Sequence, residues 1–99
     1  MIKTSQYRTQ IRIIADVLSA TKDNQINDKV GVGITTLLRK SNIPHQRLIK
    51  LIRNLIESGL LAIITDKKSS KYIITDEGRK FLNEYTKFQD FAIAFGLRI

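Results

Sequence analysis

Residues 44–61 read PHQRLIKLIRNLIESGLL and decide the fold of this chain. Pro44 suits the first turn of a helix and Gly59 is a common C-terminal stop, which predicts a helix from about Pro44 to Ser58. At about 100° per residue one side of this helix is apolar, and it consists of Leu48, Leu51, Ile52 and Leu55, flanked by Ile49 and Ile56. The opposite side is polar with a single acid, and it consists of Gln46, Arg47, Lys50, Arg53, Asn54 and Glu57. The segment therefore predicts a helix with one side in a core and one basic side.

A short β-hairpin is predicted directly after this helix. The runs 60–64 (LLAII) and 71–74 (KYII) are apolar, and the segment 65–70 between them is polar. Two such runs joined by a polar turn are typical of a hairpin. Its tip is basic because it contains Lys67 and Lys68.

The final helix is predicted from Asp76 to about Phe95. Thr75 can cap its first turn, which opens on two acids that suit the positive end of the helix dipole, and Gly96 ends it. Gly78 costs up to ~1 kcal/mol of helix propensity, so we expect it to allow close backbone packing.

Two further helices are predicted near the start of the chain. Over residues 5–20 apolar side chains recur at spacings of three and four, which predicts an amphipathic helix. These side chains are Tyr7, Ile11, Ile14, Val17 and Leu18. The polar stretch 21–28 predicts a loop. A short second helix then ends at the SNIP sequence of 41–44, and its apolar residues are Ile34, Leu37 and Leu38.

The predicted order is helix, helix, helix, hairpin, helix, with no internal repeat or linker. At this length, 99 residues, and with this charge, the order is the plan of a winged helix–turn–helix domain. We expect a mainly α fold with a small β-hairpin wing.

The composition describes one small basic domain. Lysine and arginine number 17 against nine aspartates and glutamates, a formal net charge of +8. The chain has no cysteine, which excludes disulfides and thiolate metal sites. No apolar run is long enough for a membrane span or a secretory signal, so we expect a cytoplasmic protein with an anionic partner.

The positive charge is unevenly distributed. Residues 1–74 contain 13 basic and five acidic side chains, whereas 75–99 contain four of each. No acid lies between Asp28 and Glu57, where six basic residues fall. Five of the seven aromatic residues lie in the last nineteen positions. The chain therefore combines a basic body with a neutral, aromatic tail, which indicates two roles.

Four segments carry a resemblance to a known family: IRIIADVL at 11–18, NIP at 42–44, ESGLL at 57–61 and YIITDEG at 72–78. With them the chain resembles archaeal winged-helix DNA-binding proteins, in particular small basic chromatin-associated proteins that dimerise through a C-terminal helix. The last two segments also recur in multiple-antibiotic-resistance-type and phenolic-acid-type regulators. The likeness covers about residues 7–90. The last helix is shorter than the coiled-coil arm of the chromatin proteins, and Pro44 stands where many relatives have a capping Ser or Thr.

The basic helix is the expected DNA reader. In a helix–turn–helix the second helix of the motif lies in the major groove with its N-terminal residues nearest the bases. The expected contacts here are His45, Gln46, Arg47, Lys50, Arg53 and Asn54. Arg47 and Lys50 suit guanine and Gln46 suits adenine, whereas Arg53 and Asn54 lie nearer the phosphates. The alternative is an ordinary solvated helix face.

The second helix and the wing supply further expected DNA contacts, namely Thr35, Thr36, Arg39, Lys40, Lys67, Lys68 and Lys71. Hydroxyls at a helix N-terminus bind phosphate readily, and flexible lysines neutralise phosphate without reading sequence. Thr35 and Thr36 can equally be local caps, and the wing tip can be a turn that keeps an edge strand soluble.

No catalytic or metal site is predicted. His45 is the single histidine, and its place near the apolar side of its helix indicates packing or phosphate contact. Without a second His or any Cys there is no ligand set for zinc, and no nucleophile–base pair is visible. The segment Gly31-Val32-Gly33 lacks the third glycine and the preceding strand of a dinucleotide fingerprint. We expect no enzymatic activity, no cofactor and no metal.

The last helix carries an aromatic stripe. Its spacings of 4, 3, 4 and 3 follow the a/d pattern of a coiled coil, which Phe91 widens. The stripe consists of Phe81, Tyr85, Phe88, Phe91, Ala92 and Phe95. One alternative is that the helix completes its own core. A helix of ~30 Å extends beyond what a small wing domain covers, so we expect pairing with a second copy.

These features predict a homodimer that binds double-stranded DNA as a transcriptional regulator or nucleoid-associated protein. Residues 1–75 are the expected DNA-binding domain and 76–99 the dimerisation helix, in one continuous unit. A winged helix used for protein contact is the first alternative, although such modules tend to lose the basic face. RNA binding is the second, and on the hairpin only Tyr72 offers an aromatic ring for stacking on bases.

Overall fold

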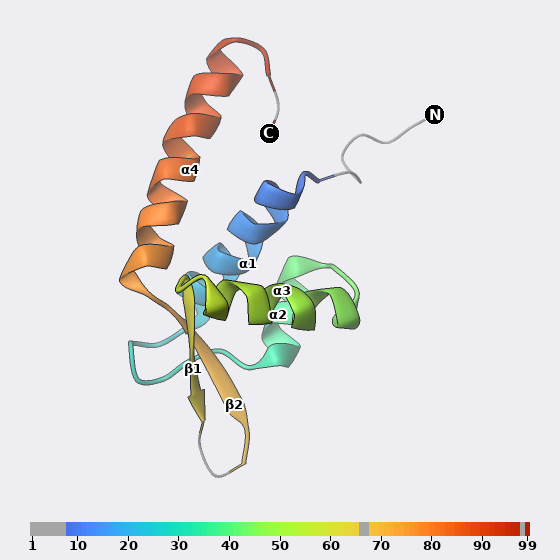
Figure 1. Ribbon diagram of the computed structural model, residues 1–99, viewed down its shortest axis with the longest axis vertical. Helices are drawn as coiled ribbons and strands as arrows, with labels where there is room; N and C mark the ends of the chain where they lie inside the picture. Colours follow the sequence, from blue (N-terminus) through green and yellow to red (C-terminus); the bar gives the residue numbers. More distant parts are fainter. Residues whose placement is uncertain (1–7, 66–67, 98) are drawn as a thin grey trace.

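The computed structural model describes residues 8–65, 68–97 and 99, and in them it shows four helices and one two-stranded antiparallel sheet (Figure 1). The elements are α1 (Gln10–Asn24), α2 (Ile34–Ser41), α3 (His45–Glu57), β1 (Leu61–Thr65), β2 (Ser70–Ile74) and α4 (Asp76–Ala94). The prediction of a mainly helical fold with a hairpin wing is confirmed.

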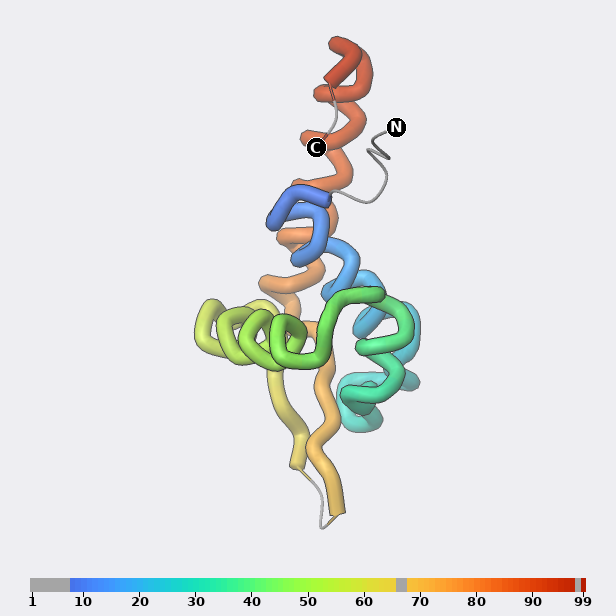
Figure 2. Tube along the Cα trace, turned by 90° about the vertical axis from the view of Figure 1, so that its right-hand side faces the viewer, coloured from blue at the N-terminus to red at the C-terminus, as the bar shows by residue number. Residues whose placement is uncertain are grey.

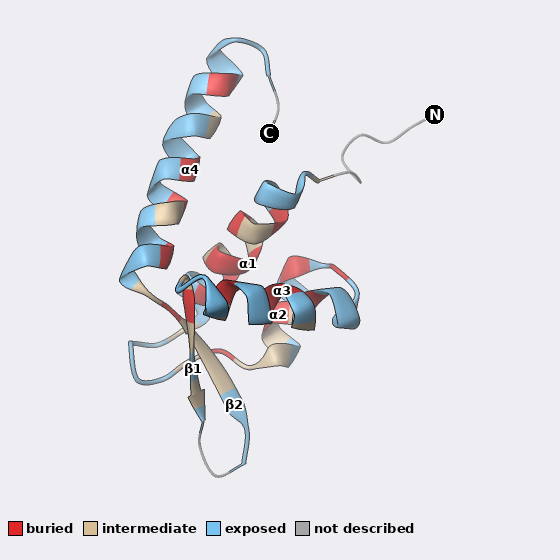
Figure 3. Cartoon of the chain, viewed as in Figure 1, coloured by how far each residue is buried: buried red, intermediate tan, exposed pale blue. Residues whose placement is uncertain are grey.

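One core joins α1, α2, α3 and the base of the hairpin. All of these elements except β2 contribute to its fully buried apolar side chains, which are Val17, Leu18, Leu37, Leu48 and Leu61. Helix α4 extends away from this body in both views (Figures 1 and 2), and most of its outer surface is exposed (Figure 3). The first half of α4 still packs into the core through Leu82 and Tyr85, whereas the exposed rings lie farther along the helix.

Helix α1 begins later than predicted. Thr9 is its N-cap, and the Thr9 side chain accepts a hydrogen bond from the backbone N–H of Arg12 at 3.1 Å. Residues 8 and 9 are therefore not helical. The predicted start at Ser5, with Tyr7 on the apolar side, lies outside the described residues.

Helix α1 also ends later than predicted, at Asn24, so the prediction of a loop over residues 21–28 is wrong for its first turn. Thr21 is fully buried and donates its hydroxyl to the carbonyl oxygen of Val17 at 2.9 Å. The side-chain amide of Asn24 donates to the carbonyl oxygen of Ala20 at 2.7 Å. Because these polar side chains bond to the helix itself, their polarity does not end it.

The wing has a third backbone segment beside its two strands. Strands β1 and β2 pair in register, with Leu61 opposite Ile74 at the base of the hairpin. Val32 adds to this sheet by exchanging two backbone hydrogen bonds of 2.8 Å with Tyr72. A Cβ on Gly31 would lie 2.6 Å from the carbonyl oxygen of Tyr72. Gly31 therefore serves a close backbone approach at the wing.

Helix α4 begins as predicted. The Thr75 hydroxyl accepts a hydrogen bond from the backbone N–H of Gly78 at 3.0 Å and donates one to the carbonyl oxygen of Gly59 at 2.6 Å. Gly78 is buried, and a Cβ there would overlap the carbonyl oxygen of Leu60 and the side chain of Ile74. The predicted close packing is confirmed, because Gly78 lets α4 start directly against the hairpin.

Ser41 carries a buried hydroxyl at the end of α2, and its Oγ has no hydrogen-bond partner in the part of the chain that the structure describes. We expect Ser41→Ala to raise the free energy of unfolding by about 1 kcal/mol, because a buried unpaired hydroxyl costs about 1–3 kcal/mol. Urea denaturation measures this change. The control Ser58→Ala, at the exposed C-cap of α3, should stay within about 0.5 kcal/mol. A clear loss of stability in Ser41→Ala would show that the hydroxyl is paired.

Candidate nucleic-acid interface

The polar side of α3 is exposed, and its apolar side is fixed in the core by Leu48, Leu51, Ile52 and Leu55. All six predicted reading residues are exposed, namely His45, Gln46, Arg47, Lys50, Arg53 and Asn54. The helix ends before Gly59, whose φ of 81° is in the left-handed region, as predicted. Figure 3 shows the outer side of α3 as an exposed surface on the body of the domain.

Among the described residues, no acid forms an ion pair with the cations on α2 and α3. The ion pairs among the described residues are formed by Arg8 and Arg12, which share one acid, and by three cations of α4. None of them involves Arg39, Lys40, Arg47, Lys50 or Arg53. Uncompensated cations on one surface create a positive potential that attracts phosphate.

His45 is exposed, so the alternative of a packed histidine is wrong. It lies in the first turn of α3, directly after the N-cap residue Pro44, whose side chain forms no capping hydrogen bond. The first backbone N–H groups of α3 therefore have no side-chain cap from Pro44 and can bond to solvent or to an anion. Phosphate contact by His45 stays a prediction.

Helix α2 presents Thr35, Arg39 and Lys40 at the surface, and Thr36 is half-buried. Its N-cap is Gly33, which has no side chain to cap the helix. Neither threonine side chain forms a hydrogen bond within the described residues, so the alternative that they are local caps is wrong.

The wing brings Lys71 next to α2. The Nζ of Lys71 lies 3.1 Å from the position that a Cβ of Gly33 would take, so its ammonium group lies at the start of α2. Lys68 is exposed near the tip of the hairpin, and Lys67 lies outside the described residues. Of the described wing lysines, Lys71 therefore lies beside α2 and Lys68 lies near the tip of the hairpin.

Arg8 ties α1 to the turn between α2 and α3. Its Nη1 donates to Oδ2 of Asp16 at 2.8 Å, and its Nη2 donates to the carbonyl oxygens of Ser41 at 2.8 Å and Asn42 at 3.2 Å. Asn42 is the C-cap of α2 with a φ of 54°. The turn between α2 and α3 is thus held in place by Arg8, a residue outside these two helices. Local sequence patterns do not predict this role of Arg8, because its two carbonyl partners lie 33 and 34 residues away.

Gln10 forms a second contact that the local sequence pattern does not predict. Its Oε1 accepts a hydrogen bond from Nη2 of Arg47 at 3.1 Å. A guanidinium has five N–H donors, so this bond leaves donors for a further partner. The first turn of α1 therefore extends the polar surface of α3, over a separation of 37 residues that no local pattern reports.

We expect Arg8→Ala to lower the free energy of unfolding by about 2 kcal/mol, because hydrogen bonds to charged groups are worth about 1.5–3 kcal/mol and this side chain is part-buried. Urea denaturation measures the loss. The control is Arg12→Ala, which removes a longer contact of 3.5 Å to the same Asp16 on one helix face and should cost about 0.5 kcal/mol. Equal losses in the two variants would contradict a special role of Arg8 at the turn.

The aromatic stripe of α4 divides into a buried and an exposed part. Tyr85 and Ala92 are buried in their own chain, so the prediction that they face a partner is wrong for these two residues. Tyr85 belongs to the core cluster that α4 shares with the rest of the domain, and its hydroxyl donates to the carbonyl oxygen of Ile99 at 3.4 Å. Leu97, in the segment after α4, donates its backbone N–H to the carbonyl oxygen of Ala92 at 2.9 Å. Three rings are 54%, 62% and 68% exposed, and they are Phe88, Phe91 and Phe95.

The exposed rings continue onto the body of the domain. Phe81 is half-buried, and with Ile11 of α1 and Phe88 it lines a cavity of about 190 Å³. At the other end Phe91 and Phe95 contact each other with ring centroids 5.0 Å apart. The exposed phenylalanines thus form one apolar surface along α4.

The described residues contain no group of three or more His, Cys, Asp or Glu side chains that could hold a metal ion. None of the helices in these residues is both long and apolar enough to cross a membrane.

Comparison with known proteins places the fold. A family model for the winged helix–turn–helix matches residues 7–92. The chain is similar to Sso10a-2, a DNA-binding protein from Sulfolobus solfataricus, with a TM-score of 0.73 and 22% identity over 89% of this chain and 85% of that chain. It is also similar to Bordetella bronchiseptica BpsR, whose DNA binding is regulated by 6-hydroxynicotinic acid, with a TM-score of 0.68 and 21% identity.

The match to BpsR covers 90% of this chain but only 60% of that chain. No curated protein matches the chain. At these identities the solved structures show a shared fold, whereas the family model covers most of the sequence. The chain belongs to the winged helix–turn–helix family.

Proposed function

We propose that this protein binds double-stranded DNA through the exposed side of α3, as a homodimeric transcriptional regulator or a nucleoid-associated protein similar to the small chromatin proteins of archaea. The observation that carries the proposal is the set of cations on α2 and α3 that no acid of the described residues neutralises. Such a surface gains affinity for duplex DNA by releasing counterions from the phosphates. The DNA binding of Sso10a-2 and BpsR supports the same reading of the fold.

The N-terminal half of α3 reads the bases. Gln46, Arg47 and Lys50 are exposed there, and a helix in the major groove presents its N-terminal residues to the base edges. Arg47 and Lys50 can donate to guanine O6 and N7, and Gln46 can pair with adenine. The bond from Arg47 to Gln10 holds the guanidinium near the start of α1 before DNA arrives.

The other predicted contact residues bind the phosphate backbone and set the register of the protein on the duplex. Those on α3 are His45, Arg53 and Asn54. Those on α2 and the wing are Thr35, Thr36, Arg39, Lys40, Lys67, Lys68 and Lys71. Lys71 stands beside the start of α2, so one phosphate can meet both elements.

The exposed surface of α4 pairs with a second copy of the chain. The three exposed rings, with half-buried Phe81, would be covered in a dimer, and a row of apolar side chains is unfavourable in water. In a twofold dimer the same surface serves both copies, and two α3 helices can address half-sites about one helical turn, ~34 Å, apart.

A competition experiment tests the proposal. The protein is bound to a fluorescent DNA duplex at low salt, and unlabelled duplex DNA or double-stranded RNA of the same sequence is added. We expect the RNA to need at least about tenfold higher concentration, because its deep major groove does not admit α3. Equal competition by RNA would favour an RNA-binding role. A protein that binds neither, and purifies without nucleic acid, would favour the alternative of a protein-contact module.

The two DNA-binding roles differ in sequence specificity. Selection from a random duplex pool enriches a palindrome if the protein is a regulator, because two reading helices are related by a twofold axis. A pool without enrichment, bound with unchanged affinity, indicates a packaging role.

A further inference from the structure

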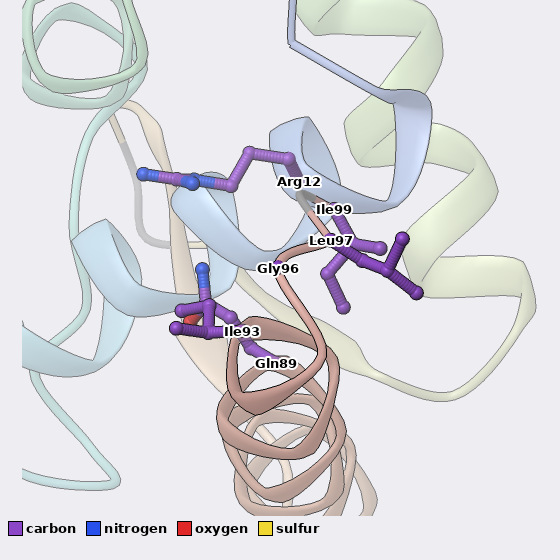
Figure 4. Close-up of a pocket in the computed structure, with 6 residues that line it drawn as sticks. All are labelled: Arg12, Gln89, Ile93, Gly96, Leu97 and Ile99. Atoms are coloured by element: carbon purple, nitrogen blue, oxygen red, sulfur yellow. The ribbon is translucent and has the colours of Figure 1, made fainter.

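We propose that a small aliphatic carboxylate binds in a cavity between α1, the distal half of α4 and the segment after α4, which contributes Gly96, Leu97 and Ile99. We propose further that this ligand changes the DNA affinity of the helix–turn–helix. The cavity has a volume of about 420 Å³, which is within the range of ~300–1,000 Å³ for small-molecule sites. Figure 4 shows its lining residues, which are Arg12, Gln89, Ile93, Gly96, Leu97 and Ile99.

The lining defines an amphipathic ligand. Ile93, Leu97 and Ile99 provide aliphatic walls, and none of the described residues that line the cavity is aromatic. Arg12 of α1 and Gln89 of α4 provide the polar groups, and they lie on the same side of the close-up (Figure 4). A hydrocarbon chain against the aliphatic walls would bring a carboxylate to the guanidinium of Arg12 and the side-chain amide of Gln89, both of which donate hydrogen bonds.

The cavity accounts for apolar exposure that the aromatic stripe does not explain. Ile93 and Leu97 are 57% and 60% exposed. Ile93 follows Phe91 by two residues, which places the two side chains on roughly opposite sides of α4 at about 100° per residue. A second copy docked on the phenylalanines would therefore leave Ile93 in water, whereas a ligand in the cavity would cover it.

The charges beside the cavity favour an anion. Arg8 and Arg12 share a single acid, Asp16, so the three side chains together carry one surplus positive charge. The shorter contact, 2.8 Å, belongs to Arg8, and the Nε of Arg12 is 3.5 Å from Oδ1 of Asp16. Arg12 is thus the less engaged cation and also the one that lines the cavity.

The same three side chains connect the cavity to the DNA-binding motif, a step that rests on the proposed function. A carboxylate on Arg12 competes with Asp16 for its guanidinium. Asp16 then pairs with Arg8 alone. Arg8 also donates hydrogen bonds to the carbonyl oxygens of Ser41 and Asn42 in the turn before α3. The ligand therefore strengthens the brace on the turn and raises DNA affinity, and DNA raises the affinity for the ligand by the same factor.

Ligand binding is tested without DNA, by titrating ¹⁵N-labelled protein with hexanoate and with its uncharged analogue hexanamide. We expect saturable shifts of the amide signals of Gln89, Ile93 and Leu97 with hexanoate, and at least about tenfold weaker binding of hexanamide, because only the carboxylate forms a charge-assisted pair with Arg12. Arg12→Gln should lose this preference, and Arg79→Gln, at the other end of α4, should keep it. Equal binding of the two compounds, no shifts, or an unchanged Arg12→Gln would overturn the proposal.

The coupling is tested by measuring duplex affinity with and without saturating hexanoate. We expect about fivefold tighter DNA binding with hexanoate, at the lower end of common couplings between sites, and no change in Arg12→Gln. Unchanged affinity of the wild-type protein would overturn the regulatory step. A protein that takes up hexanoate but binds no duplex under either condition would contradict the proposed function and the coupling together, while the carboxylate site would stand on the titration alone.

Discussion

Replacing both Arg47 and Lys50 by alanine is expected to weaken duplex binding about a hundredfold while leaving the fold intact. Each contact to a base edge is worth about 1–3 kcal/mol, and a tenfold change in affinity corresponds to about 1.4 kcal/mol. Both side chains are exposed, and neither forms an ion pair within the described residues. Their removal therefore takes away the proposed DNA contacts without opening the core. Fluorescence anisotropy gives the affinity, and thermal unfolding followed by circular dichroism checks the fold.

A variant with the same change of net charge provides the control. Arg79 and Lys80 lie in the first turns of α4, where both are exposed, and neither is a predicted DNA contact. Their double alanine variant should lose less than about threefold in affinity, because only long-range attraction is reduced. Equal losses in the two double variants would mean that only the total charge matters. An unchanged affinity of the Arg47 and Lys50 variant would place the DNA on another surface.

Replacing both Phe88 and Phe95 by glutamate is expected to convert a dimer into a monomer, with a rise of at least about a thousandfold in the dimer dissociation constant. Large buried aromatic residues at the centre of an interface cost about 2 kcal/mol or more when truncated. In a twofold dimer each substitution occurs twice, and the new carboxylates would be buried without partners. In the single chain both rings are exposed, so the substitutions leave the core of the domain unchanged.

Sedimentation equilibrium measures the mass of both forms. The matched control is Ile26→Glu, because Ile26 is 79% exposed in the loop after α1 and lies off α4. This variant should keep the mass of the wild-type protein. A monomeric wild-type protein, or a dimer that survives the double substitution, would contradict the role assigned to the phenylalanines.

The elements with local signals could be predicted from the sequence. Pro44 and Gly59 mark the ends of α3, and the cap Thr75 marks the start of α4. These ends could be predicted because each signal acts within one turn of the helix end. The end of α1 could not be predicted in this way. It depends on the burial of Thr21, which is set by packing against other elements and not by the residues around it.

The residues of the candidate site also differ in whether a local sequence signal predicts them. The exposed face of α3 follows from helical periodicity alone, and the structure places all of its predicted residues at the surface. Arg8 and Gln10 could not be found, because they act across 33 to 37 residues on the turn and on Arg47. Tyr85 is buried by packing into the core, and the segment after α4 forms hydrogen bonds with Tyr85 and Ala92, neither of which a heptad pattern reports.

The salt dependence of duplex binding tests DNA recognition by this surface most directly. We predict that the logarithm of the binding constant falls linearly with the logarithm of salt concentration between about 50 and 200 mM, with a slope of about −0.9 for each phosphate neutralised. Arg53→Ala should make this slope shallower by about one unit, because we propose that Arg53 contacts a phosphate. A flat salt response, or no binding of duplex DNA at the lowest salt, would contradict DNA binding by the cations of α2 and α3.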